Sequence, residues 1–418
     1  MPDPIADERA IAPGRPERRL WFLLGPAFVA AIAYVDPGNV AANLSAGADY
    51  GYLLVWVLVV ANAMAVLVQY LSAKLGLVTG RSLPELLGDR LPSSTRRWYW
   101  VQAEVVAAAT DLAEVIGGAI ALHILFNVPL LLGGVIVGVI STVLLSVQSR
   151  GGQRPFEFVI LGLLAVISVG FVAGLFVSPV SIAEVIGGVV PRFEGTETVL
   201  LAASMLGATV MPHAIYLHSA LAKDRHGVST DQGRLRRLLR ATRWDVVIAL
   251  VIAGTVNIAM LLLAAANLRG IPGTGTIEGA HAAIVAALGP AVGVIFGVGL
   301  LASGLASTSV GCYAGSTILA GLLRLRVPLL LRRVLTLIPA LIILAIGFDP
   351  SRALVLSQVV LSMGIPFALI PLVRYTGNRR LMGAFRNGRL TRWTAYLVTT
   401  LIVVLNLLLI WLSVAGTS

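Results

Sequence analysis

Two stretches decide the fold of this chain: Ala33-Tyr34-Val35-Asp36-Pro37-Gly38-Asn39 and Gly207-Ala208-Thr209-Val210-Met211-Pro212-His213. Each lies inside an apolar segment long enough to cross a membrane, since a spanning helix needs roughly 20 mostly apolar residues. Proline lacks a backbone N–H and clashes with the preceding turn, so we expect each helix to break near its centre. Backbone groups freed by a break cannot face lipid. They must therefore face protein or a water-filled cavity.

The composition is that of a membrane protein. Hydrophobic residues make up 57% of the 418 residues and charged residues only 12%, and the mean hydropathy is +0.90. A soluble domain averages about 25% charged residues, so this chain cannot cover a surface that faces water. Its net charge of +11 comes from short basic clusters between apolar runs, a pattern that sets orientation in a membrane and gives no nucleic-acid surface. The single cysteine, Cys312, excludes an internal disulfide and a cysteine-based metal site.

Apolar segments predict eleven membrane spans. We place them at 21–46, 51–73, 98–126, 128–147, 156–177, 197–221, 244–267, 287–322, 327–347, 352–373 and 393–414. With the N-terminus inside, every Lys and Arg except Arg192, Arg269 and Arg352 then falls in the N-terminal tail or in an inner loop, as the positive-inside rule requires. A second span within 279–323 would move two basic loops outside. We therefore predict eleven spans, a cytoplasmic tail at 1–20, and an outside C-terminus.

The two broken spans begin five spans apart. Because this number is odd, the unit 21–177 (spans 1–5) and the unit 197–374 (spans 6–10) run through the membrane in opposite directions. Paired broken helices in inverted units are typical of secondary transporters, whose binding site lies where the breaks meet near the midplane. The sequence thus predicts an all-α integral membrane protein, an inverted repeat of two five-helix units with the span 393–414 outside both.

The breaks carry side chains that suit a transition-metal ion. Asp36 is a carboxylate in an apolar span, where a charge costs at least about 2.5 kcal/mol, and Asn39 adds an amide oxygen on the same side. Asp36 could also cap the second half-helix, a role compatible with binding. Met211 follows Ala208 by three residues, which places a thioether and a freed carbonyl on one face. A lone methionine usually only packs, but thioether beside oxygen ligands favours Mn²⁺, Fe²⁺, Co²⁺ or Cd²⁺ over Mg²⁺ and Ca²⁺.

A second polar set indicates a proton route. Asp111 and Glu114 share one face of the third span, and Arg332 and Arg333, near the inner end of the ninth, could pair with them. A carboxylate–arginine chain leading inward is what proton exit requires, although arginines at this position can also be ordinary inside-loop charge. His213 could carry a proton, since histidine titrates near neutral pH, or it could be a hydrogen-bonded helix residue.

Several motifs add to these two stretches: Ser72-Ala73-Lys74-Leu75-Gly76, Thr110-Asp111-Leu112-Ala113-Glu114, Tyr216-Leu217-His218-Ser219, and Ser357-Gln358 with Gly364-Ile365-Pro366-Phe367. With Asp36-Pro37-Gly38-Asn39 and Met211-Pro212-His213, they resemble the Nramp family of proton-coupled divalent metal transporters, of the bacterial manganese type. One motif departs from the family, because Ala314-Gly315 is followed by Ser316 where glutamine is usual.

The resemblance implies a LeuT-like fold. It also implies a metal site made of Asp36, Asn39, Met211 and the carbonyls of Ala33 and Ala208, which Gln358 joins in one conformation. Finally, it implies a proton route through Asp111, Glu114, His213 and Arg333.

We therefore expect a secondary transporter, not an enzyme, that imports Mn²⁺ and related ions with protons by alternating access. It would need no cofactor, bind no nucleic acid, and work as a monomer in the plasma membrane.

A sodium-coupled amino-acid symporter could share this architecture but has no need for Met211 opposite an acid. A membrane metalloenzyme needs three strong ligands and a general base, whereas His213 and His218 are wrongly spaced for a metal face and no HExxH motif is present. A pore would need a ring of ligands from several subunits.

Overall fold

The computed structural model describes residues 25–325 and 327–415, and every regular element in these ranges is a helix. Nine helical segments of this part are long and apolar enough to cross a membrane. Two predicted spans fall outside that set: the first is divided into short helices, and the ninth, α14 (Leu329–Ala345), has 17 residues. The predicted tail at 1–20 lies outside the described residues.

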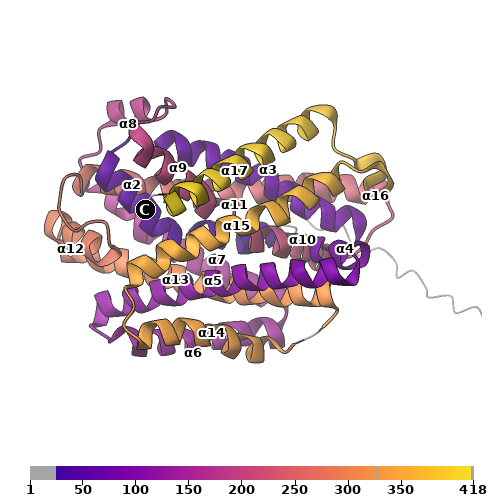
Figure 1. Ribbon diagram of the computed structural model, residues 1–418, viewed down its shortest axis with the longest axis horizontal. Coiled ribbons are helices and arrows are strands. Elements are labelled where there is room, and N and C mark those ends of the chain that lie inside the picture. The colour runs from indigo at the N-terminus through magenta and orange to yellow at the C-terminus, as the bar shows by residue number, and fades with distance from the viewer. Residues whose placement is uncertain (1–24, 326, 416–418) are drawn as a thin grey trace, which may run out of the picture.

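The helices overlap the predicted spans, although some extend beyond them: the helix Ser93–Phe126 begins five residues before its predicted start, and the helix Gln232–Asn267 begins twelve residues before. The spanning elements are α1 (Pro26–Ala31), η2 (Ile32–Tyr34), α2 (Pro37–Tyr50), α3 (Val55–Thr79), α5 (Ser93–Phe126), α6 (Leu130–Gly151), α7 (Gln153–Val172), α9 (Gly195–Thr209), α10 (Pro212–His226), α11 (Gln232–Asn267), α13 (Pro290–Leu323), α14, α15 (Pro350–Thr376) and α17 (Arg389–Ala415). The short connecting elements are α4 (Leu83–Arg90), η3 (Ala173–Phe176), α8 (Ile182–Gly188), α12 (Ile277–Leu288), α16 (Arg379–Met382) and η4 (Gly383–Phe385). In Figure 1, α8 and α12 lie at one end of the bundle, and α4 and α16 lie at the other.

The region 279–323 holds one span, as predicted. Its extra apolar residues form α12, which has 12 residues and is therefore about 18 Å long. That is too short for a hydrocarbon core of about 30 Å. Gly289, with φ of 90°, separates α12 from Pro290 at the start of α13.

Both predicted helix breaks are confirmed. The chain leaves helical geometry at Val35 (φ −131°, ψ 32°) and again at Val210 (φ −100°, ψ 84°). Pro37 and Pro212 each begin the second half-helix, where the N–H that proline lacks would have no helical partner in any case.

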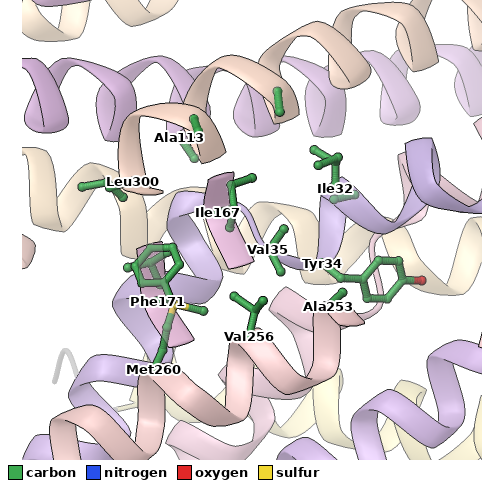
Figure 2. Packing of buried hydrophobic residues seen from close by; sticks show 14 of the residues in the cluster. Ile32, Tyr34, Val35, Ala113, Ile167, Phe171, Ala253, Val256, Met260 and Leu300 are labelled. Atoms are coloured by element: carbon green, nitrogen blue, oxygen red, sulfur yellow. The ribbon is translucent and has the colours of Figure 1, made fainter. Parts of the chain in front are cut away.

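The backbone oxygens freed at the first break face protein, as expected for groups that cannot face lipid. Asn257 Nδ2 on α11 donates to the Tyr34 oxygen at 2.7 Å, and Ser303 Oγ on α13 donates to the Val35 oxygen at 2.5 Å. Figure 2 shows the apolar surroundings of this break, where Ile32 and Val35 lie among side chains of α5, α7 and α11 such as Val256. The first break is thus enclosed by the bundle.

Gly76 allows α3 and α10 to pack backbone to backbone, and we expect its replacement by Ala to destabilise the fold. A Cβ atom at this position would lie 2.0 Å from the Ser219 oxygen, so the two helices would have to separate, at about 1–3 kcal/mol. Gly162→Ala on α7 is the matched control, because a Cβ there meets nothing within 4 Å. Thermal unfolding in detergent should show a lower melting temperature for Gly76→Ala and no loss for Gly162→Ala. Equal melting temperatures would contradict the packing argument.

Candidate functional site

Asp36 lies at the first break with its two carboxylate oxygens in different situations. It is the N-cap residue of α2, and Oδ1 accepts hydrogen bonds from Asn39 N at 2.9 Å and Asn39 Nδ2 at 2.6 Å. Oδ2 is buried and has no hydrogen-bond partner among the described residues. Buried polar oxygens are rarely left unpaired. The capping role that the sequence left open therefore uses Oδ1, while Oδ2 remains available for a ligand.

Asn39 joins the two breaks. Its Nδ2 also donates to the Ala208 oxygen at 3.0 Å, across 169 residues of sequence. This donor group lies between a carboxylate oxygen and a freed carbonyl oxygen, two acceptors that a cation could bridge. Met211, three residues beyond Ala208, is the N-cap residue of α10 and is fully buried. Ala33, in η2 of the first break, is buried as well.

Gln358 on α15 reaches the same place. An added Cβ at Gly38 would lie 1.9 Å from Gln358 Nε2 and 3.2 Å from Asp36 Oδ2, so the amide and the carboxylate both border Gly38. Gln358 is 5% exposed, and neither polar atom of its amide has a partner within the described ranges. The site thus has a second buried polar group available for a ligand.

A cavity of about 540 Å³ connects this site with one end of the molecule. Its walls come from α2, α9, α15 and the start of α12, and they include Gly38, Ser204, Ile277, Arg352 and Gln358. Figure 1 places α12 at the end of the bundle opposite α4. The cavity therefore offers a path from the α12 end to the first break.

No group of three or more His, Cys, Asp or Glu side chains that could hold a metal ion occurs in the part of the chain that the structure describes. The groups at the breaks form a different set, with one carboxylate, side-chain amides, backbone carbonyls and a thioether.

Asp111 and Arg333 form a buried ion pair. Arg333 Nη1 lies 2.5 Å from Asp111 Oδ1 and 2.6 Å from Oδ2, and Thr308 on α13 donates to the same carboxylate. Ser141 Oγ on α6 accepts from Arg333 Nε at 2.8 Å. The contact that the sequence predicted between the third and ninth spans is therefore present for this arginine.

Arg332 does not join that pair, which corrects the prediction. Its Nη2 donates to Glu104 Oε1 at 2.8 Å, and the guanidinium lies against Gly315, where an added Cβ would be 2.2 Å from Nη2. The fourth predicted member, Glu114, is fully buried, and neither of its carboxylate oxygens accepts a hydrogen bond from the described residues. It lies beside Gly311 of α13.

The two histidines of α10 have different surroundings. His213 is buried, and neither ring nitrogen has a partner in the described ranges. His218 Nδ1 lies 2.8 Å from Gln69 Oε1, and Gln69 Nε2 donates to the Tyr34 hydroxyl at 2.7 Å. The second histidine therefore belongs to a structural network next to the first break, in keeping with the absence of a predicted role for it.

Sequence reasoning missed three polar residues. Glu104 lies seven residues before Asp111, a spacing of two helical turns that would have placed it on the same face. Thr308 stands between Ser307 and Ser309 on α13, so nothing local distinguished it from its polar neighbours. Asp245 on α11 gave no local signal: its carboxylate accepts from Gly25 N and Ala27 N, both at 3.0 Å, and so holds the start of α1.

Comparison with known proteins decides the family. The model of the Nramp family, described as natural resistance-associated macrophage protein-like, matches residues 27–412. This chain belongs to the Nramp family. The divalent metal cation transporter MntH of Mycobacterium tuberculosis is 62% identical over 396 residues, which cover 95% of this chain and 92% of that protein. The protein of the same description from Deinococcus radiodurans is 44% identical over 410 residues and covers 98% and 94% of the two chains.

The fold of this Nramp protein agrees with a solved structure. A mutant of the Eremococcus coleocola manganese transporter superposes with a TM-score of 0.88 at 30% identity, covering 97% of this chain and 90% of that chain. The LeuT-like fold that the resemblance implied is therefore confirmed. As a member of this family the chain is a multi-pass membrane transporter and not an enzyme.

Proposed function

We propose that this Nramp protein imports divalent transition-metal ions, Mn²⁺ foremost, together with protons by alternating access. One observation carries the proposal: Asn39 hydrogen-bonds both Asp36 and the Ala208 oxygen, next to a buried carboxylate oxygen that has no hydrogen-bond partner among the described residues. The relatives described as divalent metal cation transporters support a metal ion as substrate. They do not favour the alternative of a sodium-coupled amino-acid symporter.

The proposed ligands are Asp36, Asn39, Met211, the carbonyls of Ala33 and Ala208, and Gln358 where the cavity reaches the site. Asp36 Oδ2 supplies the full negative charge. Asn39 would exchange its two N–H donor contacts for an oxygen contact to the ion, which requires its amide to turn. The Met211 thioether adds a soft sulfur donor, which transition-metal ions bind better than Mg²⁺ and Ca²⁺ do.

Alternating access is supported by a difference between the cavities at the two ends. A cavity of about 440 Å³ at the α4 end is lined by residues in or next to α4 and at the end of α13, and by no residue of the breaks. The cavity of about 540 Å³ leads from the α12 end to Gly38 and Gln358. At the other end, α4 is tied to α10 by Lys223 and Glu85, 2.7 Å apart, and to α13 by Arg324 and Asp89, 2.9 Å apart. We assign the α12 end to the outside, with the N-terminus cytoplasmic and the C-terminus outside, in the plasma membrane, and we propose a monomer as the working unit.

The proton route that we propose uses Asp111, Glu114, His213, Arg332 and Arg333. Glu114 and His213 are buried without hydrogen-bond partners in the described ranges. The carboxylate oxygens of Glu114 and the ring nitrogens of His213 are therefore free to take up or pass on a proton. Arg333 neutralises Asp111. Arg332 pairs with Glu104, which lies on α5 seven residues before Asp111 and therefore two helical turns closer to the α4 end. Together these groups form a charged path away from the metal site.

Uptake into proteoliposomes tests the function. Vesicles that contain the purified chain should take up Mn²⁺ and acidify, and an inward proton gradient should speed the uptake. Empty vesicles and vesicles with a sodium gradient and an amino acid are the controls. Amino-acid uptake driven by sodium, with no Mn²⁺ entry, would replace this proposal with the symporter.

Met211→Ala should change ion selectivity more than Mn²⁺ uptake. The variant removes the soft ligand and keeps the oxygens, so Cd²⁺ affinity should fall and competition by Ca²⁺ or Mg²⁺ should grow. A difference of about 1.4 kcal/mol already changes relative affinity tenfold. The measurement is Mn²⁺ and Cd²⁺ uptake against rising Ca²⁺. Met205→Ala is the control, since this buried methionine lies on α9 before the break. Overlaid inhibition curves for wild type and Met211→Ala would show that the thioether only packs.

A further inference from the structure

The segment 374–392 contains six arginines and no acidic residue. They are Arg374, Arg379, Arg380, Arg386, Arg389 and Arg392, and no Asp or Glu follows Asp349 in the sequence. Five of the six are exposed and Arg392 is partly buried. We call residues 374–392 the arginine segment. It joins the end of α15 to the start of α17 through α16 and η4, at the end of the bundle where Figure 1 shows α4.

Many other basic side chains at this end have acidic partners. Arg81 and Arg324 pair with Asp89, and Lys223 pairs with Glu85. Deeper in the bundle, Arg332 pairs with Glu104 and Arg333 with Asp111. Within the described ranges no arginine of the arginine segment takes part in an ion pair.

Buried contacts hold the arginine segment in a fixed place. Asn387, 2% exposed, accepts a hydrogen bond from Lys74 Nζ on α3 at 2.8 Å and donates through Nδ2 to Thr376 Oγ1 at 3.0 Å. Phe385 packs against the cluster that contains Leu238 and Leu239 of α11. The arginines are therefore carried on a loop anchored to three helices, and binding at their side chains would not have to order the backbone first.

Exposed apolar side chains follow the arginines directly. Leu390 is 82% exposed and Trp393 is 71% exposed, both in the first turns of α17. Tryptophan is typical of the level at which a membrane helix meets the lipid headgroups. The exposed Trp393 therefore indicates that the neighbouring arginine segment lies near the level of the lipid headgroups.

We propose that the arginine segment is a binding site for the phosphate headgroups of anionic phospholipids. Four to eight basic residues next to a membrane helix attract anionic lipids, each contributing at short range. The guanidinium group also presents paired N–H donors that match phosphate oxygens. Because Asn387 links this segment to both α3 and α15, bound lipid also stabilises the contact between a helix of the first unit and a helix of the second.

Native mass spectrometry of the full chain tests the site without any transport assay. The probes are phosphatidylglycerol and cardiolipin, with phosphatidylcholine as the neutral lipid. The test variant is Arg379→Gln, Arg380→Gln and Arg386→Gln together, none of which contributes to the Asn387 contacts. The matched control is Arg81→Gln, Arg97→Gln and Arg324→Gln, three exposed arginines at the same end of the bundle with the same loss of charge, two of which pair with Asp89.

Wild type should bind the anionic lipids more tightly than phosphatidylcholine, and the test variant should lose about tenfold or more in apparent affinity. The control and the variant with Lys at 379, 380 and 386 should keep most of the binding. Equal losses in the two Gln variants, or equal binding of anionic and neutral lipid by wild type, would overturn the proposal. So would full competition by free inorganic phosphate, because the ligand would then not be a lipid.

Discussion

Replacing Asp36 by Ala is expected to abolish Mn²⁺ uptake, by about 100-fold or more, while the protein stays folded. Asp36 is the carboxylate at the meeting point of the two broken helices, and its Oδ2 has no hydrogen-bond partner in the part of the chain that the structure describes. Loss of a charged ligand worth about 2.7 kcal/mol would already give this factor. The break itself is made by Pro37, which the variant keeps. Uptake into proteoliposomes and size-exclusion chromatography in detergent are the measurements.

The capping role of Asp36 must be separated from its proposed binding role. Asp36→Asn keeps an oxygen that can accept from Asn39 N, and asparagine caps helices about as well as aspartate, yet it removes the charge. Asp231→Ala is the reverse control, since Asp231 caps α11 through Gly233 N and Arg234 N far from the breaks. We expect Asp36→Asn to lose uptake and Asp231→Ala to retain it. Near-normal transport by Asp36→Asn would refute the site.

Breaking the ion pair of Asp111 and Arg333 should have the second large effect. Both side chains are almost fully buried, so Arg333→Ala leaves an unpaired charge inside the bundle and should cost about 3–5 kcal/mol of stability. Asp111→Asn should slow proton flux more than it weakens Mn²⁺ binding, because Asp111 lies on α5, away from the breaks. Thermal unfolding, calorimetric titration of Mn²⁺ and a pH-sensitive dye inside vesicles measure the three quantities.

The double variant Asp111→Asn with Arg333→Gln distinguishes stability from proton movement. Removing both charges together should restore much of the stability, since no unpaired charge is left, and should not restore proton flux. For stability alone, Arg332→Ala is the comparison, because its partner Glu104 is 28% exposed, so the carboxylate left behind can be solvated and the loss should be smaller than for Arg333→Ala. Lost Mn²⁺ binding with unchanged proton flux per ion would contradict the proposed role of Asp111.

The breaks could be predicted from the sequence because proline acts locally. Pro37 and Pro212 each remove one donor inside an apolar run, and the structure places the interruptions one or two residues before them. Asp36 stood out for an equally local reason, since a lone carboxylate in a spanning helix is costly. The inverted arrangement then followed from counting spans.

Partners across the fold were harder to predict. Arg332 and Arg333 are neighbours in sequence, and successive helical residues point about 100° apart. Both arginines therefore cannot meet the same carboxylate, and Arg332 turns to Glu104 instead. The contact of Gln358 with Gly38 joins α15 to α2, far apart in the sequence, and no periodicity within either helix encodes it.

The start of the first span depends on a residue more than two hundred positions away. The helix α1 has six residues. Isolated helices shorter than about 12–15 residues are marginal in water, because forming the first turn loses more conformational entropy than its one hydrogen bond offsets. The Asp245 carboxylate accepts from Gly25 N and Ala27 N and so completes a turn that could not nucleate by itself. We therefore expect docking of α1 and formation of its first turn to be coupled, so that loss of the Asp245 contacts should also unwind the start of α1.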